Sequence, residues 1–244
     1  MIETIITTKD DHQIQVYIWP NDQAKAWVHI NHGMAEHAKR YQQFAEQLIL
    51  AGYAVVAHNH RGHGDSETTQ LGSYGIESGW EKVLADIEVV RDKICTDNIP
   101  YYLFGHSMGS FIAQSYLINA TRKIDGLVLS GSNLQPVLLS KAGKFVAKIE
   151  RKRLGQSQSS RLLQFLSFGT FNQAFKPNRT EYDWLSRDNQ QVDQYISDPL
   201  CGFSCSTGLW HDFLSALAEL FSKGHWIKFK TISLYSFLVA HKTL

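Results

Sequence analysis

Short apolar runs alternate with helical patterns along the first half of this sequence, and the alternation limits the folds that the chain can adopt. Four runs have the length and hydrophobicity of buried strands: AWVHI (26–30), YAVVAH (53–58), YYLF (101–104) and GLVLS (126–130). Between them, apolar residues recur at helical spacing in residues 41–51, in 80–94 and from Ser107 to Tyr116. This order predicts an α/β fold with a mostly parallel sheet and helices on both faces.

Two regions depart from that alternation. At the start of the chain, IETIITT and QIQVYIW flank the polar turn KDDH and predict an antiparallel hairpin. From about residue 133 to residue 214 there are helical stretches and loops but no convincing buried strand. We therefore expect a discontinuous core formed by residues 1–132 and 215–244, with residues 133–214 inserted as a helical cap.

The composition indicates which binding partners and which cellular compartment to expect. Lys and Arg (24) balance Asp and Glu (23), so the net charge provides no field that would attract nucleic acid. The start of the chain lacks the apolar segment of a signal peptide, and no run approaches the roughly 18 apolar residues of a membrane span. Only Cys95, Cys201 and Cys205 carry thiols, which favours a reducing, cytoplasmic setting.

The segment GHSMG places a serine at a turn where it can act as a nucleophile. Its residues are Gly105, His106, Ser107, Met108 and Gly109, and they match the G-x-S-x-G pattern between a short apolar strand and a helix. Glycines suit the flanking positions because strand and helix crowd such a turn. Ser107 is therefore the candidate catalytic nucleophile, on a strained backbone at the carboxyl end of the sheet.

A nucleophile of this kind needs two backbone N–H groups that stabilise the oxyanion of the tetrahedral intermediate. The residue after the serine, Met108, supplies the first. The loop after the first parallel strand supplies the second, and INHGMAEH (30–37) occupies that place. We expect the second donor to be the N–H of Met34.

Three local patterns invite a metal-site interpretation, and we favour none of them. His58, His60 and His63 end the second buried strand, but no carboxylate or cysteine completes a ligand set nearby in the sequence. The pair in CGFSC lacks a second Cys or His pair at zinc spacing. HGMAEH does not have the H-E-x-x-H order of zinc peptidases.

Several separate motifs occur in one order along the chain: HGMAEHAKRY, RGHGDS, GHSMG, DPLCGF and GLWHDFL. Together they resemble the monoacylglycerol lipase and lysophospholipase branch of the α/β-hydrolases, a serine aminopeptidase-like family, over about residues 10–222. The resemblance implies a serine hydrolase that cleaves monoacyl lipid esters through an acyl-enzyme, with no cofactor and a cap over an acyl-binding pocket. It matches Ser107 to the nucleophile and Met34 and Met108 to the oxyanion donors.

Two segments of the expected cap have alternative interpretations. Residues 140–161 are rich in Lys and Arg interleaved with apolar side chains, a pattern typical of a helix on a lipid surface and equally of an ordinary solvated helix face. Peripheral membrane contact through the cap is therefore open. The run LLQFLSFGTF (162–171) fits either an acyl tunnel or the core of the cap.

The base and the acid of a catalytic triad are missing from their expected places. In this fold the acid and then the histidine follow the serine late in the chain. After Ser107 there are three histidines, His211, His225 and His241, and none follows an acid-bearing turn. No Asp or Glu occurs after Glu219, and Asp198 falls in a cap motif. We assign neither role.

The tail differs from the family in a second way. From about Gly224, HWIKFKTISLYSFLVAHKTL stops resembling the family, which has a strand and an Asp-Pro turn there. One back-translation of residues 231–244, read in another frame, gives YLFIFFSGSPQDP, which fits that strand and turn. We therefore expect a frameshift that truncates the chain and leaves the C-terminal part of the core incomplete.

Other classes of function remain open beside an impaired esterase. A non-catalytic protein that binds acyl lipids would keep the pocket without the chemistry, and a nonfunctional truncated fragment would keep neither. Peptidases, thioesterases and other acyl transferases share the same serine turn. The head group, the acyl length and the oligomeric state stay open.

Overall fold

A computed structural model describes residues 1–65, 70–134, 136–169 and 171–222 of the chain. Its centre is a six-stranded sheet in the order β1-β2-β4-β3-β5-β6. The strands are β1 (Ile2–Thr7), β2 (Gln13–Trp19), β3 (Trp27–Asn31), β4 (Ala54–His58), β5 (Tyr101–His106) and β6 (Gly126–Ser130). The hairpin strands β1 and β2 are antiparallel, and β4, β3, β5 and β6 run parallel to one another.

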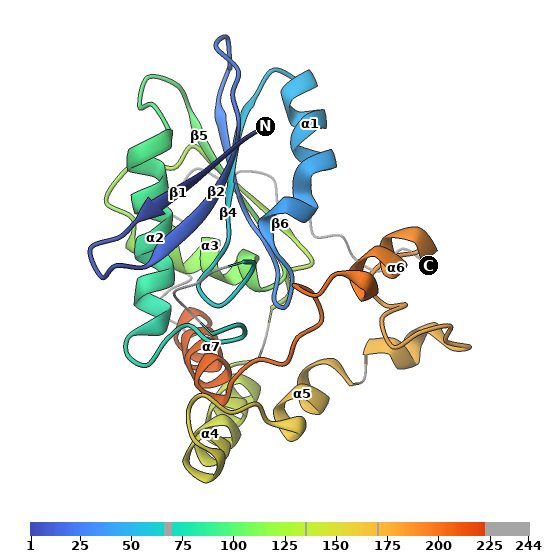
Figure 1. The fold of residues 1–244 in the computed structure, drawn as a ribbon. Helices are drawn as coiled ribbons and strands as arrows, with labels where there is room; N and C mark the ends of the chain where they lie inside the picture. The colour runs from blue at the N-terminus through green and yellow to red at the C-terminus, as the bar shows by residue number, and fades with distance from the viewer. Residues whose placement is uncertain (66–69, 135, 170, 223–244) are drawn as a thin grey trace.

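Helices cover both faces of this sheet. A 3-10 turn, η1 (Ala38–Tyr41), and α1 (Gln42–Leu50) lie on one face, whereas α2 (Gly79–Ile94) and α3 (Met108–Asn119) lie on the other (Figure 1). Side chains alternate between the two faces along each strand. In β4, for example, Val55 and Ala57 pack towards α1, and Ala54 and Val56 pack into the larger core with α2 and α3. The predicted α/β class and the elements that build it are confirmed.

Two element boundaries differ from those that the sequence predicted. The first helix begins at Gln42 after a 3-10 turn, and β5 continues past YYLF to His106. The extension follows from pairing, because Gly105 and His106 lie opposite Leu129 and Ser130 of β6. The strand therefore runs directly into Ser107.

The segment after β6 is helical in the described residues, and its only strand-like contact there is an isolated bridge between Ser159 and Ser206. It contains α4 (Val137–Leu154), α5 (Arg161–Phe168), the 3-10 turn η2 (Phe171–Phe175), α6 (Asn189–Ser197) and α7 (Thr207–Leu220). Helix α7 packs on the core, with the ring centroids of Phe213 and Phe111 5.8 Å apart, and α4 packs along α7. The boundary expected at residue 214 thus falls inside a continuous helix.

The division into core and cap therefore stays a proposal. The expected tail strand and the tail residues His225 and His241 lie outside the described residues.

Replacing Ile112 tests the contribution of α3 to the core. Its side chain has 0% exposure in the middle of that helix, so Ile112→Ala removes buried methyl groups and leaves a cavity. We expect the free energy of unfolding to fall by about 2–5 kcal/mol, measured by urea denaturation. Leu50→Ala is the control, because Leu50 ends α1 with 79% exposure. Equal losses in both variants would contradict this packing.

Candidate active site

Ser107 lies at the junction of β5 and α3 in an unusual backbone conformation. Its φ is 50° and its ψ is −119°, a region that non-glycine residues rarely occupy. Hydrogen bonds hold the turn: the Ser107 N–H donates to the carbonyl oxygen of Ser130 (2.9 Å), and the Ser110 N–H donates to that of Ser107 (2.9 Å). The strain is therefore maintained by the sheet on one side and by the helix on the other.

The two glycines of the turn are fixed by close backbone approach. A Cβ atom on Gly105 would lie 2.4 Å from the carbonyl oxygen of Gly109. A Cβ atom on Gly109 would lie 2.1 Å from the carbonyl oxygen of Asn31, at the end of β3. No side chain fits at either position, and the absence of side chains lets the loop after β3 lie against the start of α3.

That contact brings the two expected oxyanion donors to the same edge of the sheet. Met108 is the first residue of α3, so its N–H has no acceptor within the helix. Met34 lies in the loop after β3, the neighbour of β5. Glu36 braces this loop, because its Oε1 accepts from the Gly33 N–H (2.6 Å) and from the hydroxyl of Tyr41 (2.8 Å). The sequence analysis did not single out Glu36.

The side chain of His106, the second residue of GHSMG, contacts Ser130 of β6 and forms no hydrogen bond with the hydroxyl of Ser107. Its Nδ1 lies 3.1 Å from the hydroxyl oxygen of Ser130 on the adjacent strand β6. The ring also approaches Gly131 closely enough that a Cβ there would lie 3.0 Å from its Cε1 atom. His106 therefore packs between strand ends at the base of the turn.

A layer of buried histidines lies beneath the loop after β3. Its members are His29, His32, His58, His60 and His63. His29 Nε2 and His58 Nδ1 are 2.8 Å apart, and His32 Nε2 accepts from the backbone N–H of His60 at 3.0 Å. Burial lowers the pKa of His58 to about 3 and that of His63 to about 4. These neutral rings support the loop structurally.

Among the described residues, the structure pairs no base with Ser107. None of their side-chain hydrogen bonds involves its hydroxyl group. His211 Nδ1 lies 3.4 Å from Arg151 Nη1 and 3.5 Å from Asp212 Oδ1, and Asp198 pairs with His37 at 2.8 Å. His225 and His241 lie outside the described residues, so neither the base nor the acid is assigned.

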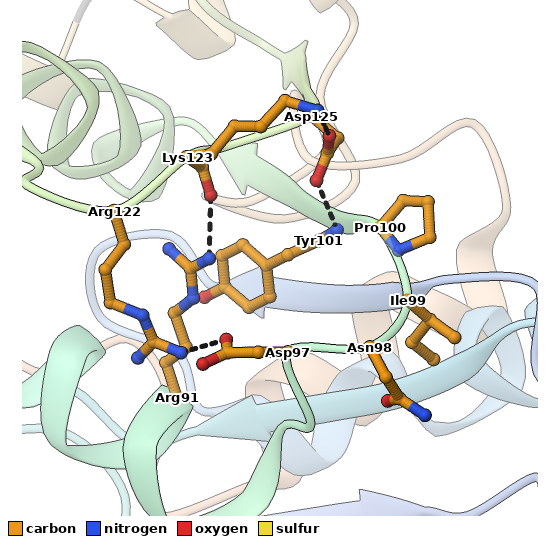
Figure 2. Close-up of a pocket in the computed structure, with 9 residues that line it drawn as sticks. All are labelled: Arg91, Asp97, Asn98, Ile99, Pro100, Tyr101, Arg122, Lys123 and Asp125. Atoms are coloured by element: carbon orange, nitrogen blue, oxygen red, sulfur yellow. Dashed lines mark hydrogen bonds and ion pairs between the residues drawn. The ribbon is translucent and has the colours of Figure 1, made fainter.

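A cavity of about 460 Å³ lies at the opposite end of β5 (Figure 2). There the guanidinium of Arg91 stacks 4.0 Å from the ring centroid of Tyr101 and donates to the carbonyl oxygen of Lys123 at 2.7 Å. Five residue steps along a strand separate Tyr101 from His106, about 17 Å. This charged cavity is therefore remote from Ser107.

Fold and turn geometry together define the class. A mostly parallel sheet covered on both faces, with a strained serine between β5 and α3, is the arrangement of an α/β-hydrolase. The sequence profile described as "Serine aminopeptidase, S33" matches residues 22–237. The chain belongs to this family.

Individual relatives agree with that assignment. The chain is 32% identical over 201 residues to the monoglyceride lipase of Mus musculus, covering 79% of this chain and 57% of the relative. It is 30% identical over 195 residues to that of Homo sapiens, with the same shares. It thus spans little more than half the length of these relatives.

Among solved structures, a thermostable carboxyl esterase from Bacillus coagulans is similar with a TM-score of 0.77 and 23% identity, over 90% of this chain and 73% of the other. This likeness supports the fold.

The helices α4 and α5, which follow β6, expose many apolar side chains. On α4 they include Leu138, Leu139 and Phe145, and on α5 they include Leu162, Phe165 and Leu166. Leu163 of the same run is buried, so this segment contributes both to the hydrophobic core and to the surface. No helix within the described ranges has the length and hydrophobicity to cross a bilayer.

The buried histidines predict a loss of stability in acid. The pKa of His63 is about 4 in the folded chain, below its ordinary value of 6.5, because burial disfavours the charged ring. The unfolded chain binds the proton first as the pH falls below 6.5. The free energy of unfolding therefore declines between about pH 6.5 and 4, by up to about 1.4 kcal/mol per pH unit for each such histidine.

Urea denaturation from about pH 7.5 to pH 5 measures this slope. The variant His63→Gln carries one titrating ring fewer, so we expect a shallower slope. A free energy of unfolding that does not change over this range would contradict the neutral histidine layer.

Proposed function

We propose that this chain hydrolyses carboxylic esters of monoacylglycerols or lysophospholipids, with Ser107 as the nucleophile. The strained backbone of Ser107 at the junction of β5 and α3 carries the proposal, because such strain persists where the surrounding structure enforces it and is concentrated at active sites. Membership of the serine aminopeptidase S33 family supports ester hydrolysis as the reaction class. The names of the relatives support a monoacylglycerol substrate.

The proposed reaction proceeds in two steps and uses no cofactor. The Ser107 oxygen attacks the ester carbonyl, its proton leaves to a base, and the N–H groups of Met34 and Met108 stabilise the oxyanion. Collapse of this intermediate breaks the ester C–O bond, the glycerol part leaves as an alcohol with the proton that the base held, and the acyl group stays on Ser107. Water then attacks the acyl-enzyme and releases the fatty acid, which regenerates the serine.

We further propose that this 244-residue chain performs the reaction slowly. The hydroxyl of Ser107 has no histidine partner among the described residues, so removal of its proton is not assisted there. A preformed oxyanion hole and substrate binding retain part of the catalysis when triad members are lost. If the reaction were too slow to matter, the same pocket would make the chain a protein that only binds acyl lipids.

Peripheral lipid contact through α4 would bring the substrate to the site. Exposed apolar side chains on this helix stand beside Lys141, Lys144 and Lys148, which is the composition of a helix at a lipid surface. We propose that the cap rests on membranes in this way while the protein works in the cytoplasm. The three thiols, all free, agree with a reducing compartment.

A fluorophosphonate probe tests the nucleophile. We expect Ser107 to be labelled slowly in the folded chain, at least about 10³-fold more slowly than in a relative with a complete triad, since no described side chain is hydrogen-bonded to its hydroxyl. Intact mass measures the adduct, and peptide mapping places it. Ser107→Ala and the urea-unfolded chain are the controls.

Each outcome decides one part of the proposal. Absence of labelling in a folded sample would remove Ser107 as a nucleophile and leave a lipid-binding protein. Labelling as fast as in the relative would show that a base is present and overturn the slow reaction. Hydrolysis of a short-chain carboxylic ester, but of neither monoacylglycerol nor lysophosphatidylcholine, would overturn the substrate class.

Sedimentation with anionic phospholipid vesicles tests the membrane contact. Phe145→Ser removes an exposed aromatic ring from α4, so we expect binding to weaken about 10-fold, in line with the burial energy of one large side chain. Ile76→Ser is the matched control, because Ile76 is equally apolar, 79% exposed and outside α4. Equal effects of both variants, or no binding by the unaltered chain, would contradict contact through α4.

A further inference from the structure

Three side chains with different metal-binding atoms converge where the loop after β3 meets the cap. The Nε2 atom of His37, a carboxylate oxygen of Asp198 and the Sγ atom of Cys201 all lie within 4.8 Å of one another. His37 comes from the core, directly before η1, and the other two follow α6. The motifs HGMAEHAKRY and DPLCGF are both visible in the sequence, but no local pattern indicates that His37 and Asp198 meet across 161 positions.

A tight turn after α6 presents Asp198 and Cys201 on the same side. The Cys201 N–H donates to the carbonyl oxygen of Asp198 at 3.0 Å. The Leu200 N–H donates to Asp198 Oδ1 at 2.9 Å and leaves Oδ2 directed at His37, 2.8 Å away. One carboxylate oxygen is thus held by the backbone while the other is available as a ligand, an outer-shell arrangement common at metal sites.

Further hydrogen bonds fix the loop that carries His37 against this turn. The Gly202 N–H and the hydroxyl of Tyr195 both donate to the carbonyl oxygen of Ala35, each at 2.9 Å. Both groups belong to the cap, whereas Ala35 stands two residues before His37. The three ligand atoms are therefore held together by a framework that does not depend on them.

We propose that His37, Asp198 and Cys201 form a binding site for Zn²⁺, with a water molecule as the fourth ligand. Imidazole nitrogen, carboxylate oxygen and thiolate sulfur are the ligands that Zn²⁺ takes in proteins, and three of them with one open position make a tetrahedral site. Mg²⁺ and Ca²⁺ prefer oxygen ligands and would not use the sulfur.

The distances need only a small adjustment. Metal–ligand bonds of about 2.1 Å place two tetrahedral ligands about 3.4 Å apart. His37 Nε2 and Asp198 Oδ2 are at 2.8 Å in a direct hydrogen bond, so this pair opens slightly to admit the ion. His37 is buried, whereas Asp198 and Cys201 are partly exposed on a turn, so rotation of these two side chains permits this movement.

The charges also balance. Burial raises the pKa of Cys201 to about 12, so the group is a thiol without metal, and Zn²⁺ binding sends its proton to solvent. The ion then faces one thiolate, one carboxylate and one neutral imidazole. Arg40 lies beside the sulfur, and its charge is offset by Glu36, whose Oε2 is 3.4 Å from Arg40 Nε.

Metal titration of the purified chain tests the site. We expect one Zn²⁺ per chain by competition with a chromophoric chelator, and a thiolate-to-metal charge-transfer band when Co²⁺ replaces Zn²⁺. Cys201→Ser and Asp198→Asn keep the size of each side chain, and the asparagine oxygen still accepts from Leu200. Both should raise the dissociation constant at least about 100-fold, because each removes a ligand.

Cys95→Ser is the matched control, since Cys95 is also a free, partly exposed thiol but lies at the end of α2. It should bind Zn²⁺ as the unaltered chain does, and Zn²⁺ should raise the unfolding temperature of both while leaving Cys201→Ser unchanged. Circular dichroism checks that each variant is folded. No binding by the unaltered chain, unchanged affinity in Cys201→Ser, or a Co²⁺ complex without the charge-transfer band would each overturn the site.

Discussion

A close backbone approach between Gly109 of α3 and Asn31 at the end of β3 sets the geometry on which the rest of the site depends. Since a Cβ atom on Gly109 would lie 2.1 Å from the Asn31 carbonyl oxygen, α3 can begin directly beneath the loop after β3 only if that residue is glycine. The same approach aligns the first N–H of α3 with the loop containing Met34. One steric constraint thus places the serine and both proposed oxyanion donors together.

The loop after β3 also needs packing beneath it to keep its position, and the buried histidine layer provides this packing. These rings pack against one another at tilted or edge-on angles and form hydrogen bonds, such as that of His32 with the backbone of His60. They fill the space under the loop after β3 with polar groups that stay neutral. Neutral imidazoles fulfil this role because a charged ring at zero exposure would lose its hydration without an anionic partner. The layer accounts for His32 of INHGMAEH and for His58, His60 and His63 of AHNHRGHGDS without a metal.

Most of the fold could be predicted from the sequence, because the patterns that determine helices and strands lie within short stretches of neighbouring residues. The alternation of Val55 and Ala57 with Ala54 and Val56, or the Gly-x-Ser-x-Gly spacing after an apolar run, is visible within a few positions and fixes element type and sheet face. Contacts between distant segments could not be found in this way. Nothing in HGMAEH indicates that His37 meets Asp198, and nothing in LLQFLSFGTF separates the buried Leu163 from its exposed neighbours.

The contact between His37 and Asp198, which sequence patterns did not predict, affects how the loop after β3 is held. The loop between β3 and η1 is held from two sides: Glu36 links Gly33 to Tyr41, and Ala35 and His37 contact α6 and the turn after it. A movement of that turn is therefore transmitted to the backbone next to Met34. The position of a proposed oxyanion donor on this loop thus depends partly on the turn after α6, so a metal ion bound there as proposed would influence the geometry around Ser107 without touching it.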